Sequence, residues 1–314
     1  MGAIIPSGQV AWGLQLPIQS QSLNFVQPWE ADAGPAELAQ ITQAADRAGA
    51  HYVGVCDHIG VPRPADEQMS STWYDTIATL GWLAALTERV HLLSHVYVLP
   101  YRHPLATAKA FATLDRLSGG RAILGAGAGH LESEFSVLGV DYATRGAQVA
   151  DAIPVIRAAF ADEYPTVGGP GADAGVGMGP RPVRDGGPPI WLGGSSKAAI
   201  RRAATLADGW LPQGPPPMGL SAALEFIRTE RQAAGLPEAF DIGATAGPVY
   251  LGTPDFEVEP YTATGSAEQI AERYRKLTAK GVNQLQFGFR GRDAAEVAEQ
   301  IERFGADVAP LLAG

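Results

Sequence analysis

The feature that most constrains the fold is a strand-then-helix alternation that repeats from one end of the chain to the other. Eight short apolar segments suit buried strands, and between them apolar residues recur three and four positions apart, as on amphipathic helices. The strand segments are 10–16, 52–56, 90–98, 122–126, 190–192, 209–211, 241–250 and 284–287. Eight such units favour a parallel sheet closed into a barrel.

Residues that favour helix ends support the helical segments. Gly49 follows the apolar stripe of 38–48, at a position where a left-handed cap ends a helix. Ser266 and Gln269 have the spacing of a capping box, and Asp293 is placed to cap the last helix. These signals predict helices that begin and end between the strands, as the barrel requires.

The main alternative is an open doubly wound sheet that binds a dinucleotide at a glycine-rich turn. Gly125, Gly127 and Gly129 stand at alternate positions in the segment ILGAGAGHLESEF. This glycine ladder follows the fourth strand rather than the first, and its spacing differs from the G-x-G-x-x-G of dinucleotide sites. We therefore predict an α/β fold of the (β/α)8 TIM-barrel type, with residues 1–314 as a single domain.

Net charge and cysteine content restrict the partners and the compartment. The formal net charge of -10 disfavours nucleic acid and anionic membrane surfaces, because both attract basic proteins. Cys56 is the single cysteine, so the chain forms no internal disulfide and suits a reducing compartment. No apolar run reaches the roughly 20 residues of a membrane span. We expect a cytoplasmic protein that acts on a small molecule.

Three long stretches interrupt the alternation. Residues 19–34 and 59–75 follow the first two strands, where the loops of a barrel form the walls of an active site. The third stretch, 162–189, follows a helix and is rich in glycine and proline. Its composition is typical of a mobile flap and equally of a disordered insertion.

The turn after the fifth strand has the features of an anion site. Gly193 and Gly194 allow a close approach, Ser195 and Ser196 offer hydroxyl groups, and Lys197 adds a positive charge at the start of a helix. The structural alternative is a serine-capped turn with a solvated lysine. On an acidic protein, local donors of this kind would hold the anionic tail of a cofactor.

Five stretches in register resemble one family, the bacterial luciferase-like superfamily, and within it the oxidoreductases that use the deazaflavin coenzyme F-420. They begin with YVGVCDH and include the glycine ladder and the turn WLGGSS, and they cover 52–58, 73–104, 112–135, 180–210 and 267–289. The resemblance implies a barrel that binds a flavin-type ring at the carboxyl ends of its strands.

Asp57 and His58 stand where the second strand ends, which is the catalytic rim of a barrel. An imidazole there can exchange a proton near neutral pH, and a neighbouring carboxylate can orient it. The resemblance implies that both lie beside the ring, with His58 as the acid or base. The alternative is that Asp57 caps a turn and His58 packs in the core.

The resemblance also implies a break in the third strand, with a cis peptide bond between His95 and Val96 held against the ring next to Ser94. Small residues are common in the family where this chain has His95. Either His95 reaches the substrate, or the strand is regular and His95 only packs.

The resemblance gives the glycine ladder a role as a platform beside the ring, with Gly127 and Gly129 near the cofactor. His130 stands where sugar-phosphate dehydrogenases of the family carry a glutamate, which argues against glucose 6-phosphate as substrate. His130 is a candidate proton donor, a contact of the ring or a plain loop residue. The remaining contacts implied for the cofactor or substrate are Ser133, Glu134, Gly209 and Trp210.

These features predict an oxidoreductase that transfers a hydride between coenzyme F-420 and a small organic substrate, with a homodimer as the family's common assembly. FMN-dependent monooxygenation on the same fold is the nearest alternative. A metal-dependent hydrolase or isomerase would use Asp57, His58, His95 and His130 as ligands instead, although no His-x-His pair follows the first strand. A non-catalytic deazaflavin carrier is the third alternative.

Overall fold

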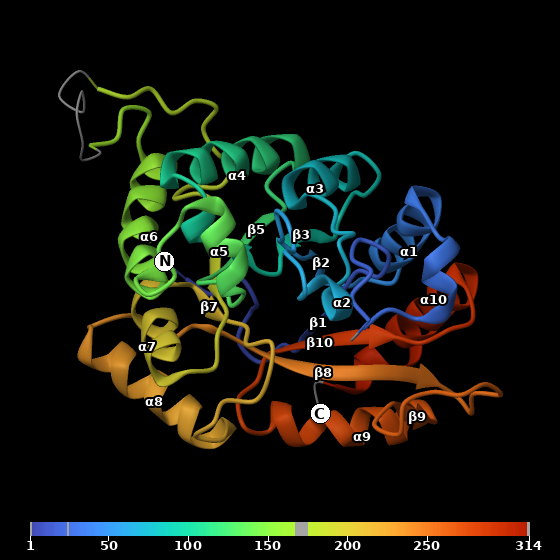
Figure 1. Cartoon of the computed structure of the whole chain (residues 1–314). Helices are drawn as coiled ribbons and strands as arrows, with labels where there is room; N and C mark the ends of the chain where they lie inside the picture. Colours follow the sequence, from blue (N-terminus) through green and yellow to red (C-terminus); the bar gives the residue numbers. More distant parts are fainter. Residues whose placement is uncertain (1, 24, 167–174, 313–314) are drawn as a thin grey trace.

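A closed barrel of parallel strands forms the centre of the computed structural model, which describes residues 2–23, 25–166 and 175–312 (Figure 1). The strands pair in the order β10-β1-β2-β3-β5-β6-β7-β8, and β8 pairs with β10 to close the barrel. Their bounds are β1 (Ala11–Gln15), β2 (Tyr52–Val55), β3 (His91–Ser94), β5 (Ala122–Gly127), β6 (Ile190–Leu192), β7 (Gly209–Trp210), β8 (Asp241–Leu251) and β10 (Gln284–Phe289). The predicted (β/α)8 fold is confirmed.

The helices surround the barrel and cover its outer face (Figure 1). Their bounds are α1 (Pro35–Arg47), α2 (Asp66–Met69), α3 (Thr76–Ala84), α4 (Pro104–Ser118), α5 (Glu132–Leu138), α6 (Arg145–Ala161), α7 (Lys197–Leu206), α8 (Leu220–Ala233), α9 (Ala267–Thr278) and α10 (Ala294–Arg303). Gly49 has the expected left-handed conformation, Ser266 and Gln269 form the capping box, and Asp293 caps α10. Among the described residues, no helix is long and apolar enough to cross a membrane.

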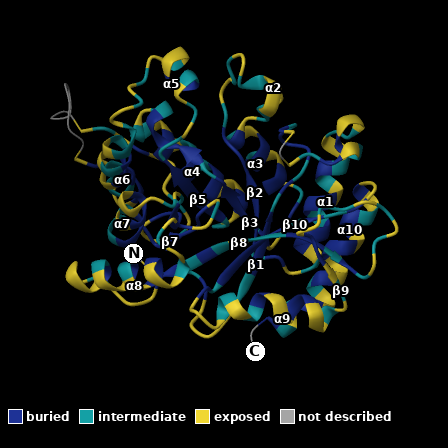
Figure 2. Ribbon diagram, turned by 60° about the horizontal axis from the view of Figure 1, so that its bottom comes forward, coloured by how far each residue is buried: buried dark blue, intermediate teal, exposed yellow. Residues whose placement is uncertain are grey.

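Two apolar cores hold the layers together. The larger core lies between the strands and the helices, and Figure 2 shows the strands as the most buried part of the molecule. A smaller cluster inside the barrel brings together Ile5, Tyr52, Leu93, Ile123, Trp191 and Leu211. Because side chains fill the interior, the space left for a ligand lies at the ends of the strands.

The glycine ladder fits against an interruption in the neighbouring strand. The stretch predicted as one strand over 90–98 is divided into β3 and β4 (Tyr97–Val98), with the implied cis peptide bond between His95 and Val96. A Cβ on Gly125 would lie 2.0 Å from the carbonyl oxygen of Ser94. On Gly127 it would lie 2.7 Å from Val96 Cγ2.

Gly129 continues this pattern, because a Cβ there would lie 2.8 Å from Val98 Cγ1. Its φ of +78° also favours glycine. The three alternate glycines thus match three alternate residues of the displaced segment, 94, 96 and 98. Packing against the neighbouring strand accounts for the ladder without a ligand, and a platform beside a ring remains a prediction.

The glycine- and proline-rich stretch after α6 lies away from the strand ends that carry the long loops. Of its residues, 167–174 lie outside the described part of the chain, so the prediction of a flap falls partly on them. In the described flanks, Val183 N donates to Asp115 Oδ2 near the end of α4, and Gly187 packs against Phe160 near the end of α6. These flanks therefore lie against the carboxyl-terminal ends of α4 and α6, which are on the same side of the barrel as the amino-terminal ends of the strands.

Candidate active site

A cavity of about 410 Å³ lies at the carboxyl ends of the barrel strands. This volume lies in the range of small-molecule sites. Seven barrel strands or the residues just after them contribute to the cavity, and the two predicted wall loops contribute Ser22, Phe25, Met69 and Trp73. The other lining residues are Gln15, Cys56, Asp57, His58, His95, Val96, Val98, Tyr101, Gly129, His130, Gln213, Thr245 and Gln286.

His58 is held by a buried glutamate. Its Nδ1 lies 2.7 Å from Oε2 of Glu134, whose other oxygen accepts the backbone N–H groups of Ile59 and Gly60. Tyr101 Oη donates to Glu134 Oε2 as well, at 2.9 Å. A carboxylate held by these donors favours a proton on Nδ1 of His58, so Nε2 of the neutral ring is free to accept one.

Aromatic rings limit the movement of this imidazole. The Trp73 ring lies 4.4 Å from the His58 ring between centroids, and the His130 ring lies 5.6 Å away, edge to face. Most of the His58 side chain is buried, with 9% exposed. His58 therefore has a fixed orientation in the cavity wall, as a general acid or base requires.

Asp57 forms a buried ion pair with Arg102. Both of its oxygens accept from the guanidinium, at 2.7 Å each, and they also accept from Val98 N and Thr76 Oγ1. This network ties β2 to β4 and to α3. With its oxygens engaged, Asp57 is suited to holding the interrupted strand in place rather than to transferring a proton.

His95 forms part of the cavity floor and is 1% exposed. Gln286 Nε2 lies 3.2 Å from its Nδ1, while its Nε2 has no hydrogen-bond partner among the described residues. Burial lowers the pKa of His95 to about 4, so the ring is neutral at pH 7. A buried donor without a partner, at the floor of a cavity, fits a ligand that carries a hydrogen-bond acceptor.

Cys56 also lines the cavity, and burial raises the pKa of its thiol to about 12. A thiol with this pKa stays protonated at neutral pH, so Cys56 acts as a small apolar side chain there.

The predicted anion turn is exposed and adjoins the cavity through one contact. A Cβ on Gly193 would lie 3.1 Å from Val96 Cγ1, which places the turn beside the interrupted strand. Ser196 Oγ caps α7 by accepting from Ala199 N, and Ser195 Oγ donates to the Gly214 carbonyl. Both serine side chains thus have structural partners, while the first N–H groups of α7 have none within the helix.

The structure brings some of the predicted site residues into the cavity and leaves others outside it. Asp57, His58, His95, Val96, Gly129 and His130 line the cavity. Ser94 is buried and donates to the Gly125 carbonyl, and Trp210 Nε1 donates to the Gly194 carbonyl beneath the turn. Gly209 packs against Trp191 and Asp241, toward the opposite end of the barrel. The other predicted contacts outside the lining are Gly127, Ser133, Glu134, Gly193, Gly194, Ser195, Ser196 and Lys197.

Several residues that line the cavity were not predicted from the sequence. Gln15, Gln213, Thr245 and Gln286 supply polar groups from the end of β1, from the residues after β7 and from within β8 and β10. A glutamine in an otherwise apolar buried strand, as in QLQFGF at 284–289, is the signal that identifies such positions. The role of Glu134 as the partner of His58 was not predicted either, because the two lie 76 positions apart.

The described residues contain no group of three or more histidine, cysteine, aspartate or glutamate side chains placed to hold a metal ion. Asp57, His58, His95 and His130 line one cavity but do not converge on a point, so the metal-site interpretation finds no support in this geometry.

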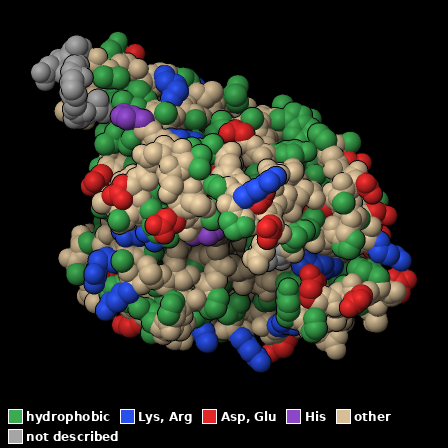
Figure 3. All heavy atoms as spheres, in the orientation of Figure 1, with side chains coloured by type: hydrophobic (Ala, Val, Ile, Leu, Met, Phe, Trp, Pro, Cys, Tyr) green, Lys and Arg blue, Asp and Glu red, His purple; other side chains and the backbone are tan. Residues whose placement is uncertain are grey.

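On the face shown in Figure 3, acidic and basic side chains of the described residues are interspersed.

Comparison with known proteins identifies the relatives. The chain is 27% identical over 263 residues to an uncharacterized protein of Mycobacterium tuberculosis, which covers 80% of this chain and 84% of the relative. It is 26% identical over 289 residues to the 5,10-methylenetetrahydromethanopterin reductase of Methanopyrus kandleri, covering 78% of this chain and 77% of the reductase.

Solved structures with the same fold are similar over nearly the whole chain. A coenzyme F-420-dependent tetrahydromethanopterin reductase from Methanopyrus kandleri superimposes with a TM-score of 0.73 at 20% identity, covering 96% of this chain and 99% of the other. A monooxygenase from Streptomyces bottropensis gives 0.76 at 20% identity, with the same coverage. An F-420-dependent secondary alcohol dehydrogenase gives 0.73 at 16% identity, covering 97% and 99%. The luciferase-like monooxygenase family matches residues 18–259, and the chain belongs to this family.

Proposed function

We propose that the protein is an oxidoreductase that binds coenzyme F-420 in the cavity and exchanges a hydride with a small organic substrate. The observation that carries the proposal is the His58–Glu134 pair. A buried carboxylate fixes the imidazole and leaves Nε2 free to accept a proton at a cavity of about 410 Å³. Hydride transfer to or from a carbon–oxygen or carbon–carbon double bond is accompanied by a proton, and a positioned imidazole exchanges it at neutral pH.

The residues of the cavity suit a tricyclic ring with a polar edge. Bound deazaflavin would supply two-electron hydride chemistry at a ring carbon, and the protein would supply orientation and electrostatics. His95 offers a buried Nε2 without a partner among the described residues, and Gln213 offers an amide group at the same floor. Val96, between Gly127 and Gly193, presents the interrupted strand to one side of the ring.

The turn 193–197 would hold the anionic tail. It is partly exposed, lies beside Val96 and leads into the first turn of α7, where Ser196 Oγ accepts from the N–H group of Ala199 and the turn as a whole favours an anion. Because the side chains of Ser195 and Ser196 already have protein partners, we assign the anion contact to backbone N–H groups and to Lys197.

The relatives support this cofactor. One curated relative is named as a methylenetetrahydromethanopterin reductase, and two similar structures are described as F-420-dependent enzymes. A riboflavin lyase described with modified FMN also shares the fold, with a TM-score of 0.77 at 15% identity over 97% of this chain and 91% of the other. FMN-dependent monooxygenation is therefore the second candidate.

Anaerobic titration of the purified protein with coenzyme F-420 and with FMN, followed by turnover assays with and without oxygen, tests the proposal. We expect saturable binding of F-420 with at least tenfold preference over FMN, and turnover of the reduced form without oxygen uptake. Preference for FMN with oxygen uptake would support the monooxygenase instead. Tight binding without turnover of any acceptor would indicate a carrier protein.

A further inference from the structure

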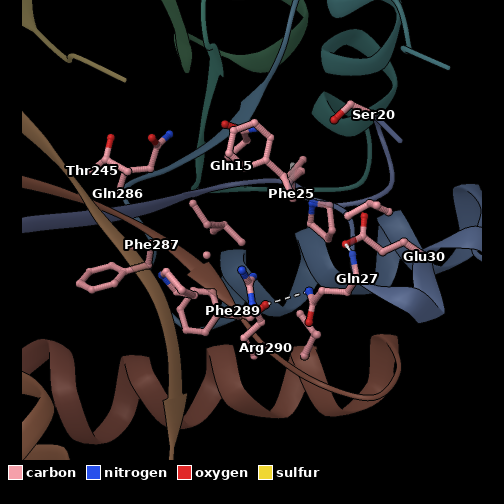
Figure 4. A pocket seen from close by; sticks show the side chains of 18 of the residues that line it. Gln15, Ser20, Phe25, Gln27, Glu30, Thr245, Gln286, Phe287, Phe289 and Arg290 are labelled. Carbon is pink, nitrogen blue, oxygen red and sulfur yellow. Dashed lines mark hydrogen bonds between the residues drawn. The ribbon is translucent and has the colours of Figure 1, made fainter. Parts of the chain in front are cut away.

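A second chamber, of about 290 Å³, opens beside the cavity that contains His58. Four residues line both spaces, namely Gln15, Phe25, Thr245 and Gln286. The chamber extends from them between the 19–34 loop and the carboxyl-terminal parts of β8 and β10 (Figure 4). It is therefore a continuation of the candidate active site rather than a separate surface pocket.

The walls of this side chamber are largely apolar. Leu14, Leu16, Pro17, Val26, Pro248, Phe287, Phe289 and Val297 line it. In Figure 4, Phe287 and Phe289 lie on one side of the chamber and Gln27 and Glu30 on another. An apolar wall of this extent favours an apolar ligand group, since each buried methylene contributes about 0.8 kcal/mol.

Three polar side chains of the side chamber are already engaged with the protein. Glu30 accepts from the backbone N–H groups of Ile18 and Gln27, and Gln27 Nε2 donates to the Phe289 carbonyl. Arg290 forms a two-pronged ion pair with Glu259, at 2.8 Å for each contact. Because these side chains already have partners in the protein, they do not require a polar ligand group to satisfy them.

The floor between the two spaces is different, because it keeps polar groups with unused capacity. Gln15 and Gln286 carry amide groups where the two spaces meet, and they are distinct from the His95 Nε2 that is assigned to the ring. A ligand that spans both spaces therefore meets a polar floor in the cavity of His58 and an apolar wall in the side chamber. The two spaces together therefore fit a molecule that has one polar reacting group and one apolar substituent.

We infer that the side chamber binds the apolar substituent of the substrate, and that the substrate class is a carbonyl compound with an aliphatic or aromatic group. The reduction of the substrate rests on the proposed function, whereas the binding of an apolar group in the side chamber does not. In the reductive direction, hydride is added to the carbonyl carbon as the carbon–oxygen π bond breaks. The oxygen takes a proton that His58 Nε2 has accepted from solvent, and the ketone gains the two electrons that the reduced coenzyme supplies as the hydride.

Calorimetric titration with a series of 2-alkanones, from 2-butanone to 2-decanone, tests the inference on the protein with and without F-420. We expect the dissociation constant to fall about fourfold for each added methylene until the chamber is full, which is the factor that 0.8 kcal/mol represents. A dissociation constant independent of chain length would overturn the inference.

Gly288 provides a variant that fills the chamber with little disturbance. It lines the chamber, and its Cβ would have only Arg290 Nη1 within 4 Å, at 3.7 Å. In Gly288→Phe we expect the dependence on chain length to disappear while 2-butanone binds within about threefold of wild type. Gly288→Val is the milder variant, and it should shorten the preferred chain.

Gly81→Leu is the matched control, because this glycine of α3 also has open space at its Cβ and lines neither cavity. It should keep the full dependence on chain length. A dependence that survives unchanged in both Gly288 variants would place the apolar group elsewhere and refute the inference. Chain-length dependence without F-420 binding would instead contradict the proposed function and leave the chamber's role intact.

Discussion

The two ends of the barrel contain the same kinds of residues and use them in opposite ways. At the amino-terminal end of the strands, Asp241 accepts from the N–H groups of Ile4 and Ile5 and from Trp191 Nε1. Asp208 accepts from Gly2 N in the same way. The amino-terminal segment thus closes this end, and its acidic residues serve as acceptors for backbone donors.

Two partly buried histidines lie at that closed end too. The His51 ring lies 4.6 Å from the His91 ring and 6.2 Å from the Trp191 ring between centroids. Burial, with a smaller effect of His91, lowers the pKa of His51 to about 3. At the open end, His58 and His95 face a cavity instead of a segment of the chain.

The difference shows that residue type alone does not identify a functional site in this fold. Buried acids, and a histidine whose Nε2 has no partner among the described residues, occur at both ends, but at the carboxyl end the imidazoles line a cavity that can hold a ligand. The role of these residues depends on what covers their end of the barrel. The long loops after β1 and β2 leave a cavity open at the carboxyl-terminal end. Substitutions at matched positions of the two ends test this interpretation.

The largest expected effect is on catalysis. His58→Gln should lower kcat for oxidation of reduced F-420 by a 2-alkanone about 10²- to 10⁴-fold, since the positioned acid or base is lost. His51→Phe, at the closed end, should leave kcat within twofold of wild type. Steady-state kinetics measures both, and equal losses in the two variants would show that the ends are not functionally distinct.

The next effect is on stability. Asp57→Asn removes the charge that pairs with Arg102 inside the site and should lower the free energy of unfolding by about 3–5 kcal/mol. Asp241→Asn should cost less, because burial raises the pKa of Asp241 to about 6 and its ionised form is already disfavoured. Urea unfolding at pH 7 compares the two variants. A larger loss for Asp241→Asn would contradict this ranking.

A smaller effect concerns pH. Because the pKa of His51 is lowered to about 3 in the folded protein, the unfolded chain binds more protons below about pH 6.5. Protonation of His51 therefore favours the unfolded chain, so the free energy of unfolding is higher near pH 7 and falls as the pH is lowered. Between pH 7 and pH 5 the loss from this group is roughly 2 kcal/mol.

His51→Phe keeps an aromatic ring between His91 and Trp191 and removes this loss. Its advantage over wild type in unfolding free energy should be larger at pH 5 than at pH 7. The same urea series at both pH values measures it, and parallel pH dependence in the two proteins would rule out the assigned role of His51.

The smallest effect distinguishes two capping serines. Ser196 caps α7 beside the cavity, and Ser266 caps α9 away from it. Replacing either by alanine should cost about 1 kcal/mol of stability. F-420 binding should depend on the turn of Ser196 alone: Lys197→Ala, which removes the assigned positive charge, should weaken it by about threefold to tenfold, whereas Ser266→Ala should leave it unchanged. Equal affinities in Lys197→Ala and Ser266→Ala would remove the turn from the tail-binding site.

Much of the fold could be predicted because it depends on local patterns. The eight strands and the caps at Gly49, Ser266 and Asp293 follow from periodicity and end signals within a few residues. The site depends on barrel closure, which brings Glu134 to His58 and Arg102 to Asp57 across 76 and 45 positions. No local pattern encodes those pairings.

The glycine ladder illustrates the same limit. Its spacing correctly argued against a dinucleotide turn, but its packing partner is the interrupted neighbouring strand, which spacing alone does not reveal. Likewise, the side chamber forms where the 19–34 loop meets β8 and β10, and only the three-dimensional structure brings these segments together.

Hydrogen–deuterium exchange with and without F-420 tests most directly the claim that the open end of the barrel binds the cofactor. We predict slower exchange at 56–60, 95–101, 129–135 and 193–199 when F-420 is bound, and unchanged exchange at 2–9 and 50–52. Protection confined to the closed end, or no protection at any of these segments despite saturating F-420, would contradict the claim.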